Sequence, residues 1–311
     1  MSGSHPHTHA ATITSQKMWW LTFFTFAFCL IELIAGYLSN SLALMSDAGH
    51  NFADGLALAL SAYAVWIAKK PSDHKRTFGY HRVGILAALI NAIGLVFMAG
   101  VIFWEAILRL RSPEPVASST MIWMAMLAVI VNSVIGWLLH EFSQKDLNIR
   151  SAYIHMLGDA AASVGVVIAG IIIAMTGAYI ADPIVSIIFA ILVLWSSWDI
   201  LNESIHILLE ATPAHINLVD VETTICEVSG VLNVHDLHVW TISSGLIACS
   251  CHIQVAEQSV SKGQEILHRV ADALEHEFKI SHSTIQIEVT DCGGHEHGVH
   301  HHDIHQHAEH Q

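Results

Sequence analysis

Long apolar stretches separated by short polar breaks make up the first two thirds of the chain. Each stretch is long enough to cross about 30 Å of hydrocarbon as a helix, which takes roughly 20 residues. The breaks contain turn-forming residues, for example Lys70-Pro71 and Ser112-Pro113. This pattern predicts six membrane-spanning helices, near 18–39, 42–68, 84–108, 119–140, 151–177 and 184–209.

The remaining third has charged segments of helical period and segments that alternate between apolar and polar residues. The expected elements are a helix, two strands, a helix and a strand, at 214–229, 231–242, 246–256, 259–279 and 283–290. Their order predicts a small cytoplasmic α+β domain with its helices on one face of the sheet. Alternation in the last two strands places Ala248, His252 and Glu288 on faces that contact water.

These patterns predict four parts: a His-containing N-terminal tail, a transmembrane domain, a cytoplasmic domain and a His-rich C-terminal tail, at 1–17, 18–209, 210–291 and 292–311. Orientation follows from the Lys and Arg residues near the spans. Eight lie on the side of the N-terminus, and only Arg109 and Arg111 lie on the other. We therefore expect both termini in the cytoplasm.

The composition supports a membrane protein, because 53% of the residues are hydrophobic and only 13% are charged. A soluble domain has roughly a quarter charged residues. A formal charge of −14 argues against a nucleic-acid partner, which needs clustered Lys and Arg. Histidine is abundant, at 24 residues. The histidines in the tails are interpreted either as weak chelators of Zn, Ni or Cu or as parts of solvated low-complexity segments.

Two of the apolar spans contain the same His-x-x-x-Asp pattern, His50 with Asp54 and His155 with Asp159. Ionisable groups inside a bilayer are costly and therefore point to function. The i, i+4 spacing puts both side chains of a pair on one helix face. Two such faces together offer two nitrogens and two oxygens, a tetrahedral set for Zn2+. The alternative is that these groups only form hydrogen bonds between helices.

The neighbouring residues suggest supporting roles. The spans run antiparallel, so both patterns can meet near the middle of the membrane, and Gly49 and Gly158 beside them would allow close helix approach. Asp47 has no partner motif and is interpreted as a supporting or structural group. Glu32 is a lone carboxylate that could face an aqueous cavity, and a role in the ion pathway stays open.

The sequence resembles the cation diffusion facilitator transporters, especially the bacterial zinc-exporting branch. The similarity spans residues 17–290, and its motifs are Ser41–Asp54, His155–Asp159, Ala181–Pro183, Leu208–Pro213, Val234–Trp240 and Thr284–Glu288. The resemblance implies a homodimer, alternating access, metal–proton antiport and a cytoplasmic metal-binding domain. It also implies that the four membrane residues bind the transported metal.

By the same resemblance, a cytoplasmic metal site falls on His235, His252 and Glu288, with His268 as a further member. His235 has the alternation parity of Leu237, so it needs a position at the start of its strand to reach the other two. Ordinary surface histidines are the alternative interpretation.

Two loops differ from those of some family members, and one further pattern suggests an additional metal site. Some members bind metal in the loop between spans 2 and 3, but this chain has Arg76 and Tyr80 near Asp73 where histidines are expected, so we predict no metal there. The loop between spans 4 and 5 is short, which favours a bacterial inner-membrane protein. Cys292 and His295 form a C-x-x-H pattern that could complete a metal site beyond the last strand.

The function that these observations favour is export of Zn2+ from the cytoplasm by proton antiport, with Zn2+ also acting as a regulator. A broader Co2+, Ni2+ or Cd2+ efflux transporter and a membrane metal sensor are the alternatives. A membrane metalloenzyme fits less well, because the chain lacks His-Glu-x-x-His and a four-ligand set leaves no open coordination position. We therefore predict no enzymatic activity.

Overall fold

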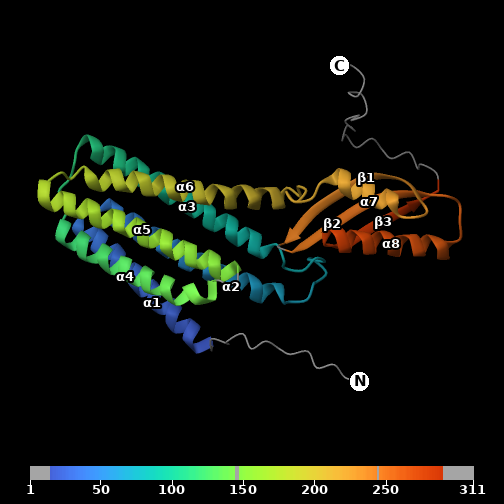
Figure 1. Ribbon diagram of the computed structural model, residues 1–311, viewed down its shortest axis with the longest axis horizontal. Coiled ribbons are helices and arrows are strands. Elements are labelled where there is room, and N and C mark those ends of the chain that lie inside the picture. Colours follow the sequence, from blue (N-terminus) through green and yellow to red (C-terminus); the bar gives the residue numbers. More distant parts are fainter. Residues whose placement is uncertain (1–14, 144–146, 244, 290–311) are drawn as a thin grey trace, which may run out of the picture. The chain divides into compact units, whose positions relative to one another are not determined.

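A computed structural model describes residues 15–143, 147–243 and 245–289 (Figure 1). The elements are α1 Ser15–Ser39, α2 Leu42–Ala68, α3 Val83–Arg111, α4 Ser118–Ser143, α5 Leu147–Thr176, α6 Ala181–Leu208, α7 Leu218–Glu227, β1 Val231–Ser243, β2 Leu246–Val255, α8 Val260–Phe278 and β3 Ile280–Glu288. The chain forms two compact units, Met1–Ile205 and His206–Gln311. The predicted order of helices and strands is confirmed. Most of the N-terminal tail and all of the His-rich C-terminal tail lie outside the described residues.

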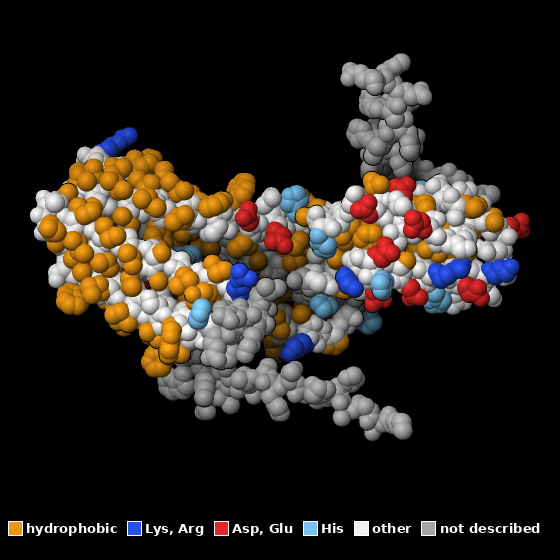
Figure 2. Space-filling model, viewed as in Figure 1, with side chains coloured by type: hydrophobic (Ala, Val, Ile, Leu, Met, Phe, Trp, Pro, Cys, Tyr) orange, Lys and Arg blue, Asp and Glu red, His pale blue; other side chains and the backbone are white. Residues whose placement is uncertain are grey.

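The first unit is a bundle of long apolar helices. Within the described residues, five helices from α2 to α6 are long and apolar enough to cross a membrane, and α1 has a shorter apolar segment, Phe26–Ser39. Large hydrophobic side chains such as Trp104, Trp137 and Trp195 are exposed on its surface. Figure 2 shows many hydrophobic side chains on the face of this unit that is in view. So large an exposed apolar surface is expected to face lipid.

Helix α2 is central to the packing of this bundle. One group of buried side chains joins α2 to α3 and α6 and includes Leu42, Leu95, Ala99, Phe189 and Val193. A second group joins α2 to α4 and α5 and includes Ala43, Leu44, Met121, Ala125 and Val166. Small residues at several of these contacts allow the helices to approach closely.

The start of α2 is fixed by a carboxylate from the start of α6. Asp182 accepts hydrogen bonds from the Ser41 hydroxyl at 2.6 Å and from the backbone N–H groups of Leu42 and Ala43 at 2.8 and 3.2 Å. The first N–H groups of a helix have no partner within it, and the helix dipole favours a negative charge there. Asp182 therefore sets the position of α2 against α6.

The second unit is a three-stranded sheet in the order β1-β2-β3, with two helices packed on it. Strands β1 and β2 form an antiparallel hairpin, and β2 and β3 are parallel, joined by the crossover helix α8. Helices α7 and α8 contact each other and the sheet, so the prediction of two helices on one face is confirmed. The core contains Ile253, Val270 and Leu274.

The predicted alternation is correct for most of β2 but wrong at one position. Ile247, Cys249, Cys251, Ile253 and Val255 are buried as expected, but Ala248 is also fully buried. This strand is central, and Ala248 lies between Trp240 on β1 and His282 on β3. Its small side chain is therefore covered by larger neighbours on the polar face.

Candidate metal sites

The four ionisable residues predicted inside the membrane meet in the structure, and we call them the membrane cluster: His50, Asp54, His155 and Asp159. His155 Nε2 lies 3.0 Å from Asp54 Oδ2 and 3.6 Å from Asp159 Oδ2. His50 Nε2 lies 3.5 Å from Asp54 Oδ2 and 3.7 Å from Asp159 Oδ1. Each imidazole therefore faces both carboxylates.

The spacing in the two helices explains this arrangement. Residues four apart lie on one face of a helix, so α2 supplies one imidazole and one carboxylate and α5 supplies the other two. Donor atoms of His50, Asp54 and His155 all lie within 4.8 Å of one another, a separation that a single metal ion can bridge. Asp159 borders the same space through its contacts with both imidazoles.

The membrane cluster is open on one flank and closed on the other. The His155 and Asp54 side chains are 44% and 29% exposed, whereas His50 and Asp159 are 15% and 7% exposed. Asp159 Oδ2 is buried without a hydrogen-bond partner. A buried carboxylate oxygen with no donor is unfavourable, which suits a position where a cation binds.

Of the two glycines predicted to allow close helix approach beside the cluster, only Gly49 does so. A Cβ atom at Gly49 would lie 2.5 Å from the Met98 sulfur on α3, so a small residue is needed there. A Cβ atom at Gly158 would have no neighbouring atom within 4 Å. The prediction for Gly158 is therefore wrong, because among the described residues no atom of another element lies beside the position that a side chain would take there.

Three buried polar residues, Ser163, Asp47 and Glu32, lie near the membrane cluster. The sequence indicated Asp47 as a supporting group and left a pathway role open for Glu32, but it did not indicate Ser163. The Ser163 hydroxyl lies 2.9 Å from Asp47 Oδ2 and 3.0 Å from the backbone oxygen of Asp159. Asp47 is fully buried, in agreement with a supporting position. Glu32 is also fully buried and accepts a hydrogen bond from Asn51, so it does not face an aqueous cavity. A lone serine in an apolar span gave no signal from which the Ser163 contact could be predicted.

A second group lies on the sheet of the other unit, and we call it the sheet cluster: His235, His252 and Glu288. His235 Nε2 lies 3.2 Å from Glu288 Oε2, and His252 Nδ1 lies 3.1 Å from Glu288 Oε1. Strands β1, β2 and β3 each supply one residue. The prediction that Glu288 faces water is wrong, since its side chain is only 2% exposed beneath the two imidazoles.

His235 reaches this cluster through an irregularity in β1. It pairs directly with His252, and the register then shifts before His238. Asp236, within this shift, has a φ of 52°, a left-handed conformation that a non-glycine residue adopts rarely. The extra residue reverses the alternation, so His235 and Leu237 need not share a face. No pattern in the sequence marks this bulge.

The remaining predicted ligands stand apart from the sheet cluster. His268 is exposed on α8 and is not among the three grouped residues. Cys292 and His295 lie outside the described residues. His238 is 3.1 Å from Asp236, and Asp236 in turn is 3.7 Å from His252. Asp236 thus adds a carboxylate at the edge of the cluster that sequence reasoning did not identify.

The loop between α2 and α3 forms a turn around Asp73. Its carboxylate accepts hydrogen bonds from the backbone N–H groups of Lys75 and Arg76 at 2.8 and 2.7 Å and from the Tyr80 hydroxyl at 2.9 Å. The Lys75 N–H, followed by the Tyr80 hydroxyl, holds the pKa of Asp73 below its usual range. These contacts give the carboxylate a structural role in the turn.

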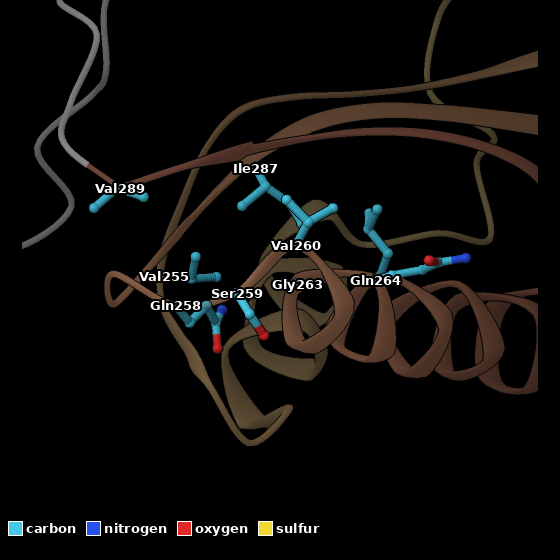
Figure 3. Close-up of a pocket in the computed structure, with 9 residues that line it drawn as sticks. Val255, Gln258, Ser259, Val260, Gly263, Gln264, Ile287 and Val289 are labelled. Carbon is cyan, nitrogen blue, oxygen red and sulfur yellow. The ribbon is translucent and has the colours of Figure 1, made fainter.

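A groove in the second unit is a different kind of surface. It runs between the start of α8 and the ends of β2 and β3, and Figure 3 shows Val255, Val260, Ile287 and Val289 around it. Its polar lining residues are Gln258, Ser259 and Gln264. Neither amides nor a hydroxyl are preferred ligands of a transition metal, so we do not regard it as a metal site.

Comparison with known proteins gives matches along nearly the whole chain. Residues 18–209 match the family model of the cation efflux transmembrane domain, and residues 213–290 match that of the cation efflux protein cytoplasmic domain. The chain is 40% identical over 299 residues to the cadmium, cobalt and zinc/H(+)-K(+) antiporter of Bacillus subtilis (strain 168), covering 95% of this chain and 94% of that protein.

Two further relatives are similar over comparable lengths. The zinc transporter ZitB of Escherichia coli (strain K12) is 38% identical and covers 94% of this chain and 95% of its own. The metal cation efflux system protein CzcD of Cupriavidus metallidurans is 37% identical and covers 94% and 92%. With the long apolar helices, these matches show that the chain is a multi-pass membrane protein of the cation efflux, or cation diffusion facilitator, family.

Proposed function

We propose that this protein exports Zn2+ from the cytoplasm in exchange for protons, with the membrane cluster as its transport site. The observation that supports this most directly is the mutual contact of two imidazoles and two carboxylates from α2 and α5. Two carboxylates and two neutral imidazoles have a net charge of −2, which Zn2+ balances. Such a balanced set lowers the penalty for placing a divalent ion among apolar helices.

The exchange of metal for protons follows from the chemistry of these ligands. An imidazole must be neutral to bind metal, and an unperturbed imidazole titrates near pH 6.5. Protons can therefore occupy His50 and His155 when the metal has left. The name of the Bacillus subtilis relative, a cadmium, cobalt and zinc/H(+)-K(+) antiporter, supports an exchange of metal for protons. The name of the Escherichia coli relative, a zinc transporter, supports zinc as the transported ion.

The uneven exposure of the membrane cluster supports alternating access. Asp54 and His155 lie on an open flank, whereas Asp159 is nearly buried. A transporter needs a state in which the ion enters from one side while the other is closed. In the proposed cycle, rearrangement of α2 and α5 against their neighbours opens the opposite flank.

We further propose that the sheet cluster binds a regulatory Zn2+. Glu288 Oε2 is buried without a hydrogen bond, although it lies close to His235. Two nitrogens and a carboxylate fit three positions of a zinc site. The ion would be held by His235, His252 and Glu288. Because each residue comes from a different strand, the ion would link the three strands of the sheet. We also propose that the protein is a homodimer in the inner membrane of a bacterium, with both termini in the cytoplasm.

Broader metal efflux is the second candidate. The name of the Bacillus subtilis relative includes cadmium and cobalt, and imidazole also binds nickel and other borderline metals. Reconstitution into liposomes with an imposed pH gradient tests both candidates, with Zn2+, Cd2+, Co2+, Ni2+ and Mn2+ compared. Zinc-selective uptake supports the first, and similar uptake of Cd2+ and Co2+ supports the second. No uptake of any metal would leave a metal sensor as the better explanation.

A further inference from the structure

A second pair of carboxylates lies beside the membrane cluster, and the proposed transport site does not use it. Glu32 on α1 and Asp47 on α2 are both 0% exposed. Asn51 Nδ2 donates a hydrogen bond to Glu32 Oε2 at 3.3 Å, and the Ser163 hydroxyl donates to Asp47 Oδ2 at 2.9 Å. The other oxygen of each group, Glu32 Oε1 and Asp47 Oδ1, is buried and has no hydrogen-bond donor.

These two carboxyl groups face each other within hydrogen-bonding reach. Two carboxylates in one apolar site cannot both be ionised without a large repulsion, and a lone acceptor there is unfavourable. A single proton between them removes both problems, because a protonated carboxyl donates a hydrogen bond to its ionised neighbour.

In the described part of the chain, no Lys or Arg side chain forms an ion pair that would neutralise Glu32 or Asp47. The titratable groups around the pair are Cys29 on α1, His50 and Asp54 on α2, and Asp159 on α5. Helix α4 also packs on α1, and it has no titratable residue between Ser118 and His140. No Lys or Arg occurs in α1 after Lys17 or anywhere in α2. Helix α3 also packs on α2, but its Arg109, in the last turn, contacts Glu105, Glu114 and the backbone oxygen of Asn40. The neutralising charge is therefore assigned to a bound cation. A proton is favoured because both carboxyl groups are fully buried and a proton shared between two carboxyl oxygens needs no further ligand.

A hydroxyl connects this pair to the metal ligands. Ser163 Oγ lies 2.9 Å from Asp47 Oδ2 and 3.0 Å from the backbone oxygen of Asp159. A hydroxyl has one hydrogen, so Ser163 can donate to only one of these acceptors at a time. An ionised Asp47 attracts that hydrogen, and a protonated Asp47 leaves it free for Asp159. The charge of the pair can therefore alter the backbone that positions a metal ligand.

We propose that Glu32 and Asp47 form a proton-binding site separate from the membrane cluster, and that the proton it binds is one of those exchanged for metal. The inference rests on the proposed antiport. In this scheme the proton is shared by the carboxyl groups of Glu32 and Asp47 when the metal site is empty. Arrival of a divalent ion nearby favours the doubly ionised pair, and the proton leaves to water.

The test compares the full-length wild-type protein with Glu32→Gln and Asp47→Asn, two near-isosteric changes that supply a permanent donor in place of the proton. Glu32→Asp, which keeps a titratable group, serves as the rescue variant. Glu105→Gln makes the same chemical change near the end of α3 and serves as the matched control. The protons released per bound Zn2+ are measured in detergent by titration calorimetry in buffers of different ionisation enthalpy. Zinc uptake is then measured in liposomes with and without a pH gradient.

We expect Glu32→Gln and Asp47→Asn to bind Zn2+ but to release about one proton fewer per metal ion than the wild type. Their zinc uptake should respond less to the pH gradient. Glu32→Asp and Glu105→Gln should behave as the wild type does. An unchanged proton count in both amide variants would overturn the proposal, and so would loss of zinc binding, since the pair is placed outside the metal site.

Two other outcomes are distinguishable. If a potassium gradient at equal pH drives zinc uptake in the wild type but not in Glu32→Gln, while the proton count is unchanged, the site binds a monovalent metal ion and the proton assignment is wrong. If the wild type shows no metal uptake under any gradient, the proposed antiport fails. The calorimetric count does not need transport, so in that case it still decides whether the pair binds a proton.

Discussion

The membrane cluster and the sheet cluster use the same chemistry on different backbones. Two helices supply two imidazoles and two carboxylates in the first, and three strands supply two imidazoles and one carboxylate in the second. With neutral imidazoles the first set has a charge of −2 and the second a charge of −1. Zn2+ is balanced only in the first, where low-polarity surroundings screen charge poorly. The sheet cluster lies on a polar face, where solvent and nearby Asp236 can offset the remaining charge.

The two clusters also differ in how they are enclosed. The carboxylate that contacts both imidazoles of the sheet cluster is 2% exposed. In the membrane cluster, Asp54 is 29% exposed and His155 is 44% exposed. A partly open, charge-balanced site suits an ion that must enter and leave. A site built around a buried carboxylate suits an ion that stays bound and stabilises the fold.

The largest effect is expected from removing a carboxylate of the membrane cluster. Asp54→Ala removes a charge that offsets that of the metal and a contact to both imidazoles. Transport should fall by more than the roughly 10–100-fold that loss of a supporting hydrogen-bond partner typically causes at a metal site. Uptake of Zn2+ into liposomes measures this. Asp73→Ala in the α2–α3 loop is the matched control and should retain normal uptake; similar uptake in both variants would remove Asp54 from the transport site.

A second, smaller effect is expected from changing the ligand type without changing the number of ligands. His50→Asp replaces a nitrogen with an oxygen and adds a negative charge beside Asp54 and Asp159. Carboxylates are friendlier than imidazole to harder ions, so discrimination against Mn2+ or Cd2+ should weaken. The pH dependence of flux, measured between about pH 5.5 and 8, should also shift, because one imidazole that can carry a proton has been replaced. Metal competition in liposomes checks both points, and an unchanged ranking and profile would contradict a ligand role for His50.

A substitution that disturbs the packing beside the membrane cluster should have a more moderate effect, and this effect is on stability. Gly49→Ala places a methyl group 2.5 Å from the Met98 sulfur, whereas Gly158→Ala meets no atom within 4 Å. Overpacking of this kind typically destabilises by about 1–3 kcal/mol, and a flexible methionine keeps the effect toward the lower end. Thermal unfolding in detergent should therefore show a lower midpoint for Gly49→Ala only. Equal midpoints would mean that α2 and α3 have room to separate.

The smallest effect on transport is expected from the sheet cluster. Glu288→Gln keeps the size of the buried side chain but removes its charge. It should lower the amount of tightly bound Zn2+ by about one ion per chain, because one ligand of a three-residue set is lost. Metal analysis after dialysis measures the bound zinc. Flux at saturating Zn2+ should stay close to normal, and a large loss of that flux in folded protein would show that the two clusters act as one pathway.

The difference between helix and strand also explains how much could be predicted from the sequence. The i, i+4 pairs placed His50 with Asp54 and His155 with Asp159 correctly, because helical spacing fixes which side chains share a face. The six long helices were readable from the length of the apolar stretches, and the helix-strand order of the second unit was readable from periodicity. The apolar composition identified the membrane unit, because a bilayer imposes length and polarity directly on the sequence.

The parts that could not be predicted depend on contacts between distant residues. The bulge at Asp236 changes which face His235 occupies, and Glu288 is buried only because two imidazoles from other strands cover it. Gly158 resembled Gly49 in the sequence, but only Gly49 is approached by another helix. The carboxylate pair of Glu32 and Asp47 needed the packing of α1 on α2, which no spacing along the chain indicates.

The central claim is that the metal crosses the membrane through the four-residue membrane cluster. Zinc uptake into liposomes under an imposed pH gradient, measured side by side for the wild type, Asp159→Ala and Glu288→Ala, tests it most directly. The account predicts uptake by the wild type, uptake at saturating metal by Glu288→Ala, and none by Asp159→Ala. Normal uptake by folded Asp159→Ala would contradict the claim.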